Sequence, residues 1–144
     1  MFGFLKTLFG GQQTQAKPIR KPSNPDRTRR LSGDGKFDVK VAGTSKNQGE
    51  IKQTDKSLGS NHSGDFLVNL APEPSNPYDA NAITVKHKGN LLGYIPADLA
   101  SEVHEALSDA GISGGECKAM ARIVGHGKET LGIRLNIARP AKVA

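Results

Sequence analysis

Several residue types that define common classes of protein are scarce or missing in this chain. Its 144 residues include one cysteine, Cys117, and no tryptophan, and its four histidines lack the short spacing of metal sites. A single cysteine forms no intrachain disulfide and no thiolate cluster for zinc, which is typical of a protein made in a reducing compartment. We therefore expect no metal, no cofactor and a cytoplasmic location.

Long hydrophobic runs are also missing. No stretch approaches the roughly 20 apolar residues that cross a bilayer, so we expect no transmembrane segment. The first nine residues are mostly apolar, but they lack the leading positive region and the cleavage site of a secretory signal. Phe2, Leu5 and Leu8 have helical spacing. Residues 1–10 are therefore either a short docking helix for a partner or membrane surface, or a frayed terminus.

Motifs of catalysis are absent from the sequence. There is no Walker-type phosphate loop, and no spacing of serine and histidine suggests a triad. A metal-dependent nuclease needs two or more carboxylates that converge, whereas Glu73, Asp79 and Asp98 fall in separate predicted turns. We therefore expect a binding protein and not an enzyme.

Positive charge is concentrated near the start of the chain. The net charge is +6, and residues 1–35 hold seven Lys or Arg against two Asp. Prolines and basic residues are interleaved there, a composition that buries little apolar area, so residues 11–35 are expected to form a flexible basic linker. Such a linker either attracts nucleic-acid phosphates with a strong salt dependence or only keeps the chain soluble.

From residue 36 the pattern changes to short strands with one buried face. Phe37, Val39 and Val41 alternate with polar residues, which indicates a strand. After Pro96, which suits the first turn of a helix, an apolar stripe at helical spacing runs to Gly111. Further strands are predicted at 50–52 (weak, inside a polar loop), 66–70, 82–86, 91–95, 116–124 and 130–138. The sequence thus predicts a mainly β domain, a small β-barrel with one helix, over residues 36–138 and a C-terminal tail over 139–144.

Residues 76–85 join a polar loop to a strand and are the most informative segment. Asn76 favours a turn, Tyr78 supplies a flat ring, and Asp79 supplies acceptor oxygens. The alternation that begins at Ile83 then predicts a strand with one buried face. Because binding residues are usually presented on loops held by a rigid scaffold, this loop is our candidate ligand site.

Separate segments of the sequence match one known pattern. They are Val41-Ala42-Gly43-Thr44-Ser45, Glu73-Pro74, Asn76-Pro77-Tyr78-Asp79-Ala80-Asn81-Ala82-Ile83, Leu92-Gly93-Tyr94-Ile95-Pro96 and Asp98-Leu99-Ala100. On these residues the chain resembles the HIRAN domain over roughly residues 36–138. The resemblance implies a small β-barrel related to the oligonucleotide-binding (OB) fold. The family occurs fused to DNA-remodelling helicases and as small free-standing bacterial proteins, and the chain resembles the free-standing bacterial type. The resemblance also implies binding of the free 3′ end of single-stranded DNA, as in the best-understood members.

The resemblance and the chemistry of the side chains together suggest roles in DNA binding. A base stacked on an aromatic ring contributes about 1–3 kcal/mol, and Tyr78 is the first candidate for that ring. The resemblance implies that Asp79 accepts a hydrogen bond from the terminal 3′-OH, although such an aspartate can instead cap its own turn. Tyr94 is either a second ring near the pocket or a half-buried tyrosine with a bonded hydroxyl, and Asn81 mainly organises the loop. Candidate phosphate contacts, which solvated strand faces would equally explain, are Lys46, Arg122 and Arg134.

The chain departs from the DNA-binding members of the family at four positions. Ser45 and Lys46 stand where those members have an arginine and an aromatic residue, and Pro72 and Ala97 stand where many have a basic residue. Fewer fixed cations predict weaker phosphate binding, unless the basic linker compensates. In the alternative hypothesis the same loop binds a protein, and the domain recruits a DNA repair helicase or nuclease.

Overall fold

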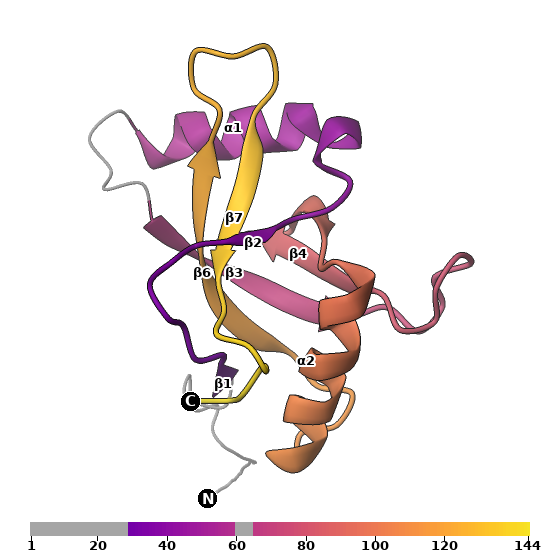
Figure 1. Cartoon of the computed structure of the whole chain (residues 1–144). Helices are drawn as coiled ribbons and strands as arrows, with labels where there is room; N and C mark the ends of the chain where they lie inside the picture. The colour runs from indigo at the N-terminus through magenta and orange to yellow at the C-terminus, as the bar shows by residue number, and fades with distance from the viewer. Residues whose placement is uncertain (1–28, 60–64) are drawn as a thin grey trace, which may run out of the picture.

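The computed structural model describes residues 29–59 and 65–144, which form a mainly β fold (Figure 1). The predicted fold class is confirmed, because the strands of the described chain form one strongly curled sheet. The prediction of a single helix is wrong, since the described residues include two α-helices. The predicted docking helix at 1–10 and most of the predicted linker lie outside the described residues.

Seven strands of the described chain form this sheet (Figure 1). The order across the sheet is β2-β7-β6-β3-β4-β5, with antiparallel neighbours, while the short strand β1 lies parallel beside β6. The bounds are β1 Arg29–Arg30, β2 Val39–Lys40, β3 Asp65–Pro72, β4 Ile83–His87, β5 Asn90–Tyr94, β6 Cys117–Val124 and β7 Gly132–Asn136.

The sheet curls until its two end strands meet. Just beyond β2, the backbone N–H of Ala42 donates to the carbonyl of Tyr94 at 2.8 Å, and the N–H of Tyr94 donates back to the carbonyl of Ala42 at 2.9 Å. The strands approach so closely that a Cβ on Gly93 would overlap the carbonyl oxygen of Ala42 and a methyl group of Val41. Glycine is therefore needed at this position, where one backbone passes close to another.

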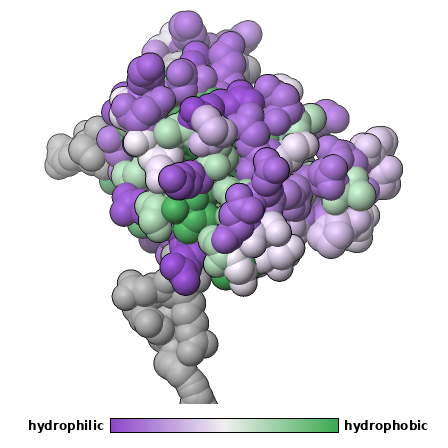
Figure 2. Space-filling model, turned by 60° about the horizontal axis from the view of Figure 1, so that its bottom comes forward, coloured by the Kyte–Doolittle hydropathy of each residue, from purple (hydrophilic) through white to green (hydrophobic). Residues whose placement is uncertain are grey.

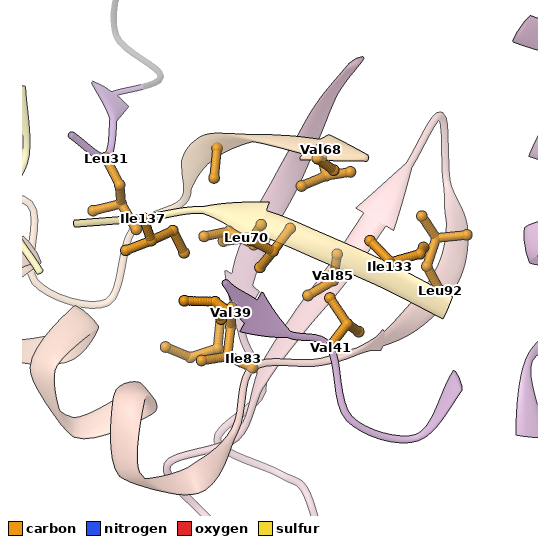
Figure 3. Packing of buried hydrophobic residues seen from close by; sticks show 14 of the residues in the cluster. Leu31, Val39, Val41, Val68, Leu70, Ile83, Val85, Leu92, Ile133 and Ile137 are labelled. Atoms are coloured by element: carbon orange, nitrogen blue, oxygen red, sulfur yellow. The ribbon is translucent and has the colours of Figure 1, made fainter. Parts of the chain in front are cut away.

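The strands bury one face, as their alternating sequences predict. In β3 the side chains of Phe66, Val68 and Leu70 are buried, whereas Leu67 and Asn69 between them are more exposed. Buried side chains of the neighbouring strands point toward those of β3 and complete a single core (Figure 3). The structure confirms, with slightly shifted ends, the strands predicted at 66–70, 82–86, 91–95, 116–124 and 130–138.

Two local predictions of strands need correction. Phe37 has a positive φ of 51° and lies outside the sheet, so the first predicted strand is reduced to β2. The weak strand predicted at 50–52 is wrong, because those residues belong to α1 (Gln48–Leu58), which buries Ile51 and Thr54. A single apolar residue in a polar segment establishes neither a period of two nor one of 3.6.

The side chain of Gln48 joins α1 to the barrel by two hydrogen bonds. Its amide nitrogen donates to the carbonyl of Leu131 at 2.8 Å, and its oxygen accepts from the N–H of Leu131 at 2.9 Å. The amide thus pairs with the backbone just before β7 as a neighbouring strand would. This contact places α1 across the β6–β7 end of the sheet, as Figure 1 shows.

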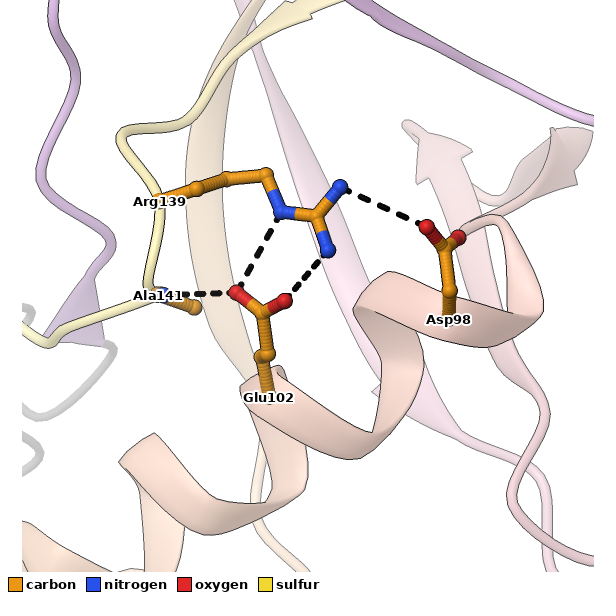
Figure 4. A network of polar contacts seen from close by, with 4 residues as sticks. All are labelled: Asp98, Glu102, Arg139 and Ala141. Carbon is orange, nitrogen blue, oxygen red and sulfur yellow. Dashed lines mark hydrogen bonds and ion pairs between the residues drawn. The ribbon is translucent and has the colours of Figure 1, made fainter.

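The helix predicted after the second signature segment is confirmed as α2 (Ala97–Asp109). Its apolar stripe, which includes Leu99, is buried. Arg139, from the C-terminal segment, forms ion pairs with Glu102 and Asp98 on the outer side of the helix (Figure 4). The chain after β7 is therefore held against α2.

The described fold extends beyond the predicted boundaries, residues 36–138, at both ends. Arg29–Arg30 pair with the start of β6, and Leu31 is 3% exposed. Leu31 also forms a bridge with Val143, and the N–H of Ala144 donates to the carbonyl of Arg30 at 2.8 Å. Residues 29–31, predicted to belong to the linker, and residues 143–144, predicted to belong to the tail, thus contribute to the sheet and the core. Local composition does not show this, because the pairing partners are distant in sequence.

Replacing Gly93 with alanine should lower the free energy of unfolding by about 1–3 kcal/mol, the usual effect of adding a methyl group to a closely packed site. The methyl group would separate the strands that the two backbone hydrogen bonds join. Urea unfolding followed by circular dichroism measures the change. Gly49→Ala is the matched control, because the new Cβ meets no atom within 4 Å and lies in α1. It should raise stability by up to about 1 kcal/mol. Equal stability of Gly93→Ala and the wild type would contradict the prediction.

Candidate nucleic-acid interface

The loop between β3 and β4 is held in shape by the side chain of Asn76. Its Nδ2 donates to Oε1 of Glu73 at 2.8 Å. Its Oδ1 accepts from the backbone N–H groups of Tyr78 at 2.8 Å and Asp79 at 3.0 Å. One amide therefore fixes the backbone of both candidate ligand residues relative to the end of β3. The sequence indicated that Asn76 favours a turn, but it did not predict these three hydrogen bonds.

Asn81, predicted to organise the loop, contributes through its backbone. Its N–H donates to Oδ1 of Asp79 at 2.9 Å, which is the turn-capping contact considered for this aspartate. Its carbonyl lies 3.0 Å from Nε2 of His104 in α2. The second contact ties the loop to the helix. The position of His104 in the sequence gave no sign of this contact with Asn81.

Tyr78 projects from this loop into solvent. Large apolar side chains are scarce on the surface, which is hydrophilic over most of the face seen in Figure 2. Among the described residues, the exposed large hydrophobic side chains are Leu67, at 39%, and Tyr78, at 96%. A ring this exposed makes little contact with its own domain, so both of its faces are available to a ligand.

Asp79 has one carboxylate oxygen engaged and one available. Oδ1 accepts the backbone hydrogen bond from Asn81. Oδ2 makes no hydrogen bond with any other residue that the structure describes. The side chain is only partly exposed, and its backbone is fixed by Asn76. The available oxygen is therefore an acceptor with a defined position.

Tyr94 faces the same region from β5. Its hydroxyl donates to Oε1 of Glu73 at 2.9 Å, the same oxygen that accepts from Asn76. This bond raises the pKa of the Tyr94 hydroxyl, because ionisation would place two negative charges together. The pKa of the Glu73 carboxyl is lowered, first by the bond from Asn76 and then by that from Tyr94. Glu73 thus joins the loop to the last strand of the barrel.

These residues line an open pocket with a volume of about 300 Å³. The pocket lies where the barrel closes, between the β3–β4 loop and the start of α2. Its lining is mostly apolar with a few polar groups, which is common in ligand sites. The structure thus brings Tyr78, Asp79 and Tyr94 together. The lining residues are Ala42, Asn76, Tyr78, Asp79, Ala82, Tyr94, Ile95 and Ala97.

The three basic residues proposed from the sequence lie away from the pocket lining. Lys46 is exposed at the end of the short 3-10 helix Thr44–Lys46. Arg122, on β6, pairs with Asp65 at 2.8 Å, and its guanidinium lies 3.9 Å from the centre of the Phe37 ring. Arg134 is the neighbour of Arg122 across the β6–β7 pair. The two arginines therefore belong to the outer face of the sheet.

Two features of the described part of the chain concern metal ligands and membrane spans. There, no three His, Cys, Asp or Glu residues gather in a way that could hold a metal ion. Likewise, neither described helix combines the length and the apolar character needed to span a bilayer.

The described chain is thus a mainly β module in which an exposed ring and a fixed carboxylate lie beside a pocket. Residues 34–140 match the family model of the HIRAN domain. The chain therefore belongs to the HIRAN family, a family of nucleic-acid-binding modules. Comparisons with curated proteins and with solved structures found no match.

Glu73→Gln should lower the pKa of the Tyr94 hydroxyl toward the ordinary tyrosine value of about 10, because the negative charge that opposes ionisation is removed. Alkaline titration followed by the ultraviolet absorbance of tyrosinate measures this pKa. The chain has two tyrosines, so Tyr94→Phe serves as the control that identifies the signal of Tyr94. An unchanged titration curve in Glu73→Gln would show that the Tyr94–Glu73 hydrogen bond does not form in solution.

Proposed function

We propose that this domain binds single-stranded DNA at its free 3′-OH end, in the pocket beside Tyr78 and Asp79. The observation that supports the proposal best is their pairing at one pocket, an aromatic ring that is 96% exposed and a partly buried carboxylate with a free oxygen. Membership of a family of nucleic-acid-binding modules supports the same ligand class.

Tyr78 supplies stacking without selecting a base. Every base has a flat face, and stacking on an aromatic ring contributes about 1–3 kcal/mol per base regardless of sequence. The hydrogen bond that Asn76 accepts from the Tyr78 backbone restrains the backbone that carries the ring. Such a platform suits a domain that recognises the end of a strand and not its sequence.

Asp79 supplies the distinction between an end and the interior of a strand. A carboxylate repels phosphate, so internal nucleotides, whose 3′ oxygen is esterified, are disfavoured next to Oδ2. A terminal nucleotide instead offers a hydroxyl that can donate to this oxygen. Hydrogen bonds to charged groups contribute about 1.5–3 kcal/mol, which is enough for a clear preference.

None of the described residues that line the pocket is a cation that could hold phosphate. Ala97 lines the pocket at a position where many family members have a basic residue. Ser45, three positions after the lining residue Ala42, stands where the DNA-binding members have an arginine. End recognition here therefore depends on stacking and on the hydroxyl contact. Phosphate attraction has to come from residues outside the pocket.

Asp79→Asn tests end recognition, because asparagine keeps an oxygen for the turn but removes the charge. The wild type should bind an oligonucleotide with a free 3′-OH at least about tenfold more tightly than one with a 3′-phosphate, a difference of about 1.4 kcal/mol. Asp79→Asn should reduce this ratio severalfold, mainly by improving binding of the 3′-phosphate form. Fluorescence anisotropy of labelled oligonucleotides measures both affinities.

Two variants control this experiment. Asp109→Asn makes the same change in net charge at an exposed position outside the pocket and should leave the ratio unchanged. Tyr78→Ala should lower the affinity for both oligonucleotides by a similar factor, because stacking does not depend on the end group. If the wild type binds both ends equally, end recognition is refuted, and the pocket is reassigned to a protein ligand.

A further inference from the structure

We propose that the outer face of the sheet binds backbone phosphates of the DNA strand whose 3′ end occupies the pocket. The contacts come from a row of side chains across four neighbouring strands, which we name the cationic row. This proposal rests on the function proposed above and adds the path of the strand beyond its terminal nucleotides. The members of the row are Lys86, Asn69, Lys118 and Arg30.

The register of the sheet places these residues side by side. Asn69 on β3 is the partner of both Lys86 on β4 and Lys118 on β6, and Lys118 is the partner of Arg30 on β1. Strands lie about 4.8 Å apart, so the row spans roughly 14 Å. The residues next along each of the three longer strands, such as Leu70, are buried in the core. The row therefore lies on the opposite, outer face.

The charges of the row are available to a ligand. None of its three cations forms a salt bridge with another described residue, whereas Arg122 on the same face is held by Asp65. No carboxylate belongs to the row. Glu116 lies two positions before Lys118 in the chain, and Glu73 is near Lys86, but neither carboxylate forms a salt bridge with a cation of the row. Three cations within about three strand spacings attract consecutive phosphates, and no ion pair has to be broken first.

The row begins beside the pocket. Tyr94 is paired with Thr84, which lies two positions before Lys86 on the same strand, so these residues share one face of the sheet. Lys86 is also close enough to Glu73 for its charge to help lower the pKa of that carboxyl. Since Glu73 accepts the hydroxyl of Tyr94, the cationic row starts next to one wall of the pocket.

An apolar side chain lies beside the row. Leu67 lies two positions from Asn69 along β3, and Met120 is its partner on β6. Leu67 and Tyr78 are the large hydrophobic side chains exposed in the described chain. Grooves that bind single strands combine positive charge with flat or apolar surface for the bases. One exposed apolar residue therefore lies at the pocket, and the other lies along the proposed path.

The row also gives the strand a direction. With the 3′ end at the pocket, the preceding nucleotides cross β4, β3 and β6 toward Arg30 on β1. The sequence immediately before β1 contains further basic residues, including Arg27 and Lys21. These basic residues precede, in the sequence, the strand at which the proposed path ends.

The test removes the charges of the row in a triple variant, Lys86→Gln, Lys118→Gln and Arg30→Gln. Two oligothymidines are compared by anisotropy, a dinucleotide that reaches only the pocket and a strand of about twelve nucleotides, within the length that one OB-type barrel covers. The variant should bind the long strand at least about tenfold more weakly and the dinucleotide within about twofold of the wild type. Because each phosphate contact on a single strand contributes about 0.7 to the slope of log K against log salt, the slope should fall by about 2.

A matched triple variant, Lys52→Gln, Lys56→Gln and Lys128→Gln, removes the same charge from exposed positions away from the row and should have a much smaller effect. A charge-preserving variant, Lys86→Arg, Lys118→Arg and Arg30→Lys, should bind the long strand like the wild type. Equal effects of the two Gln variants on the long strand would overturn the proposal. An equal loss of affinity for the dinucleotide and the long strand would also overturn the proposal, because the substitutions would then act by changing the pocket and not by removing phosphate contacts along the strand.

The ratio of 3′-OH to 3′-phosphate binding separates this proposal from the function on which it rests. The triple Gln variant of the row should retain the wild-type ratio, which also shows that its pocket is folded. If that ratio is retained and long-strand binding is unaffected, the cationic row is refuted while end recognition stands. If the wild type shows no preference for either end but the row still controls long-strand binding, end recognition fails alone.

Discussion

The pair of backbone hydrogen bonds between Ala42 and Tyr94 is the constraint on which the candidate site depends. These bonds join the two ends of the sheet, and both residues line the pocket. In an open sheet, β2 and β5 would each present an unpaired edge, and the pocket would lose one wall. Closure also requires a residue without a side chain beside it, which explains why Gly93 precedes Tyr94. The same contact thus stabilises the barrel and shapes the site.

Glu73 links this closure to the loop between β3 and β4. A single carboxylate oxygen accepts from Asn76 in the loop and from Tyr94 in the closing strand. His104 adds a contact from α2 to the far side of the same loop. The exposed ring of Tyr78 therefore lies on a loop whose backbone is held by contacts to β5 and α2. Little conformational entropy remains for a ligand to remove from the loop when it binds.

The sequence predicted what depends on local periodicity and missed what depends on distant partners. Alternating residues in β3, β6 and β7 and the apolar stripe of α2 were sufficient to place those elements. Gln48 gave no sign that its side chain would pair with Leu131 and support a helix, and two-residue β1 has no period at all. In the site, the motif indicated Tyr78 and Asp79. The roles of Glu73 and His104 depend on contacts across the fold, which no spacing along the chain encodes.

The bridge between Leu31 and Val143 brings the start and the end of the described fold side by side, as Figure 1 also shows. Neither residue lines the pocket. A domain with adjacent ends can be inserted into a surface loop of another protein, or fused at either end, with little change to the geometry of its host. Attachment of another domain at either end of the described fold would therefore leave the shape of the candidate pocket unchanged.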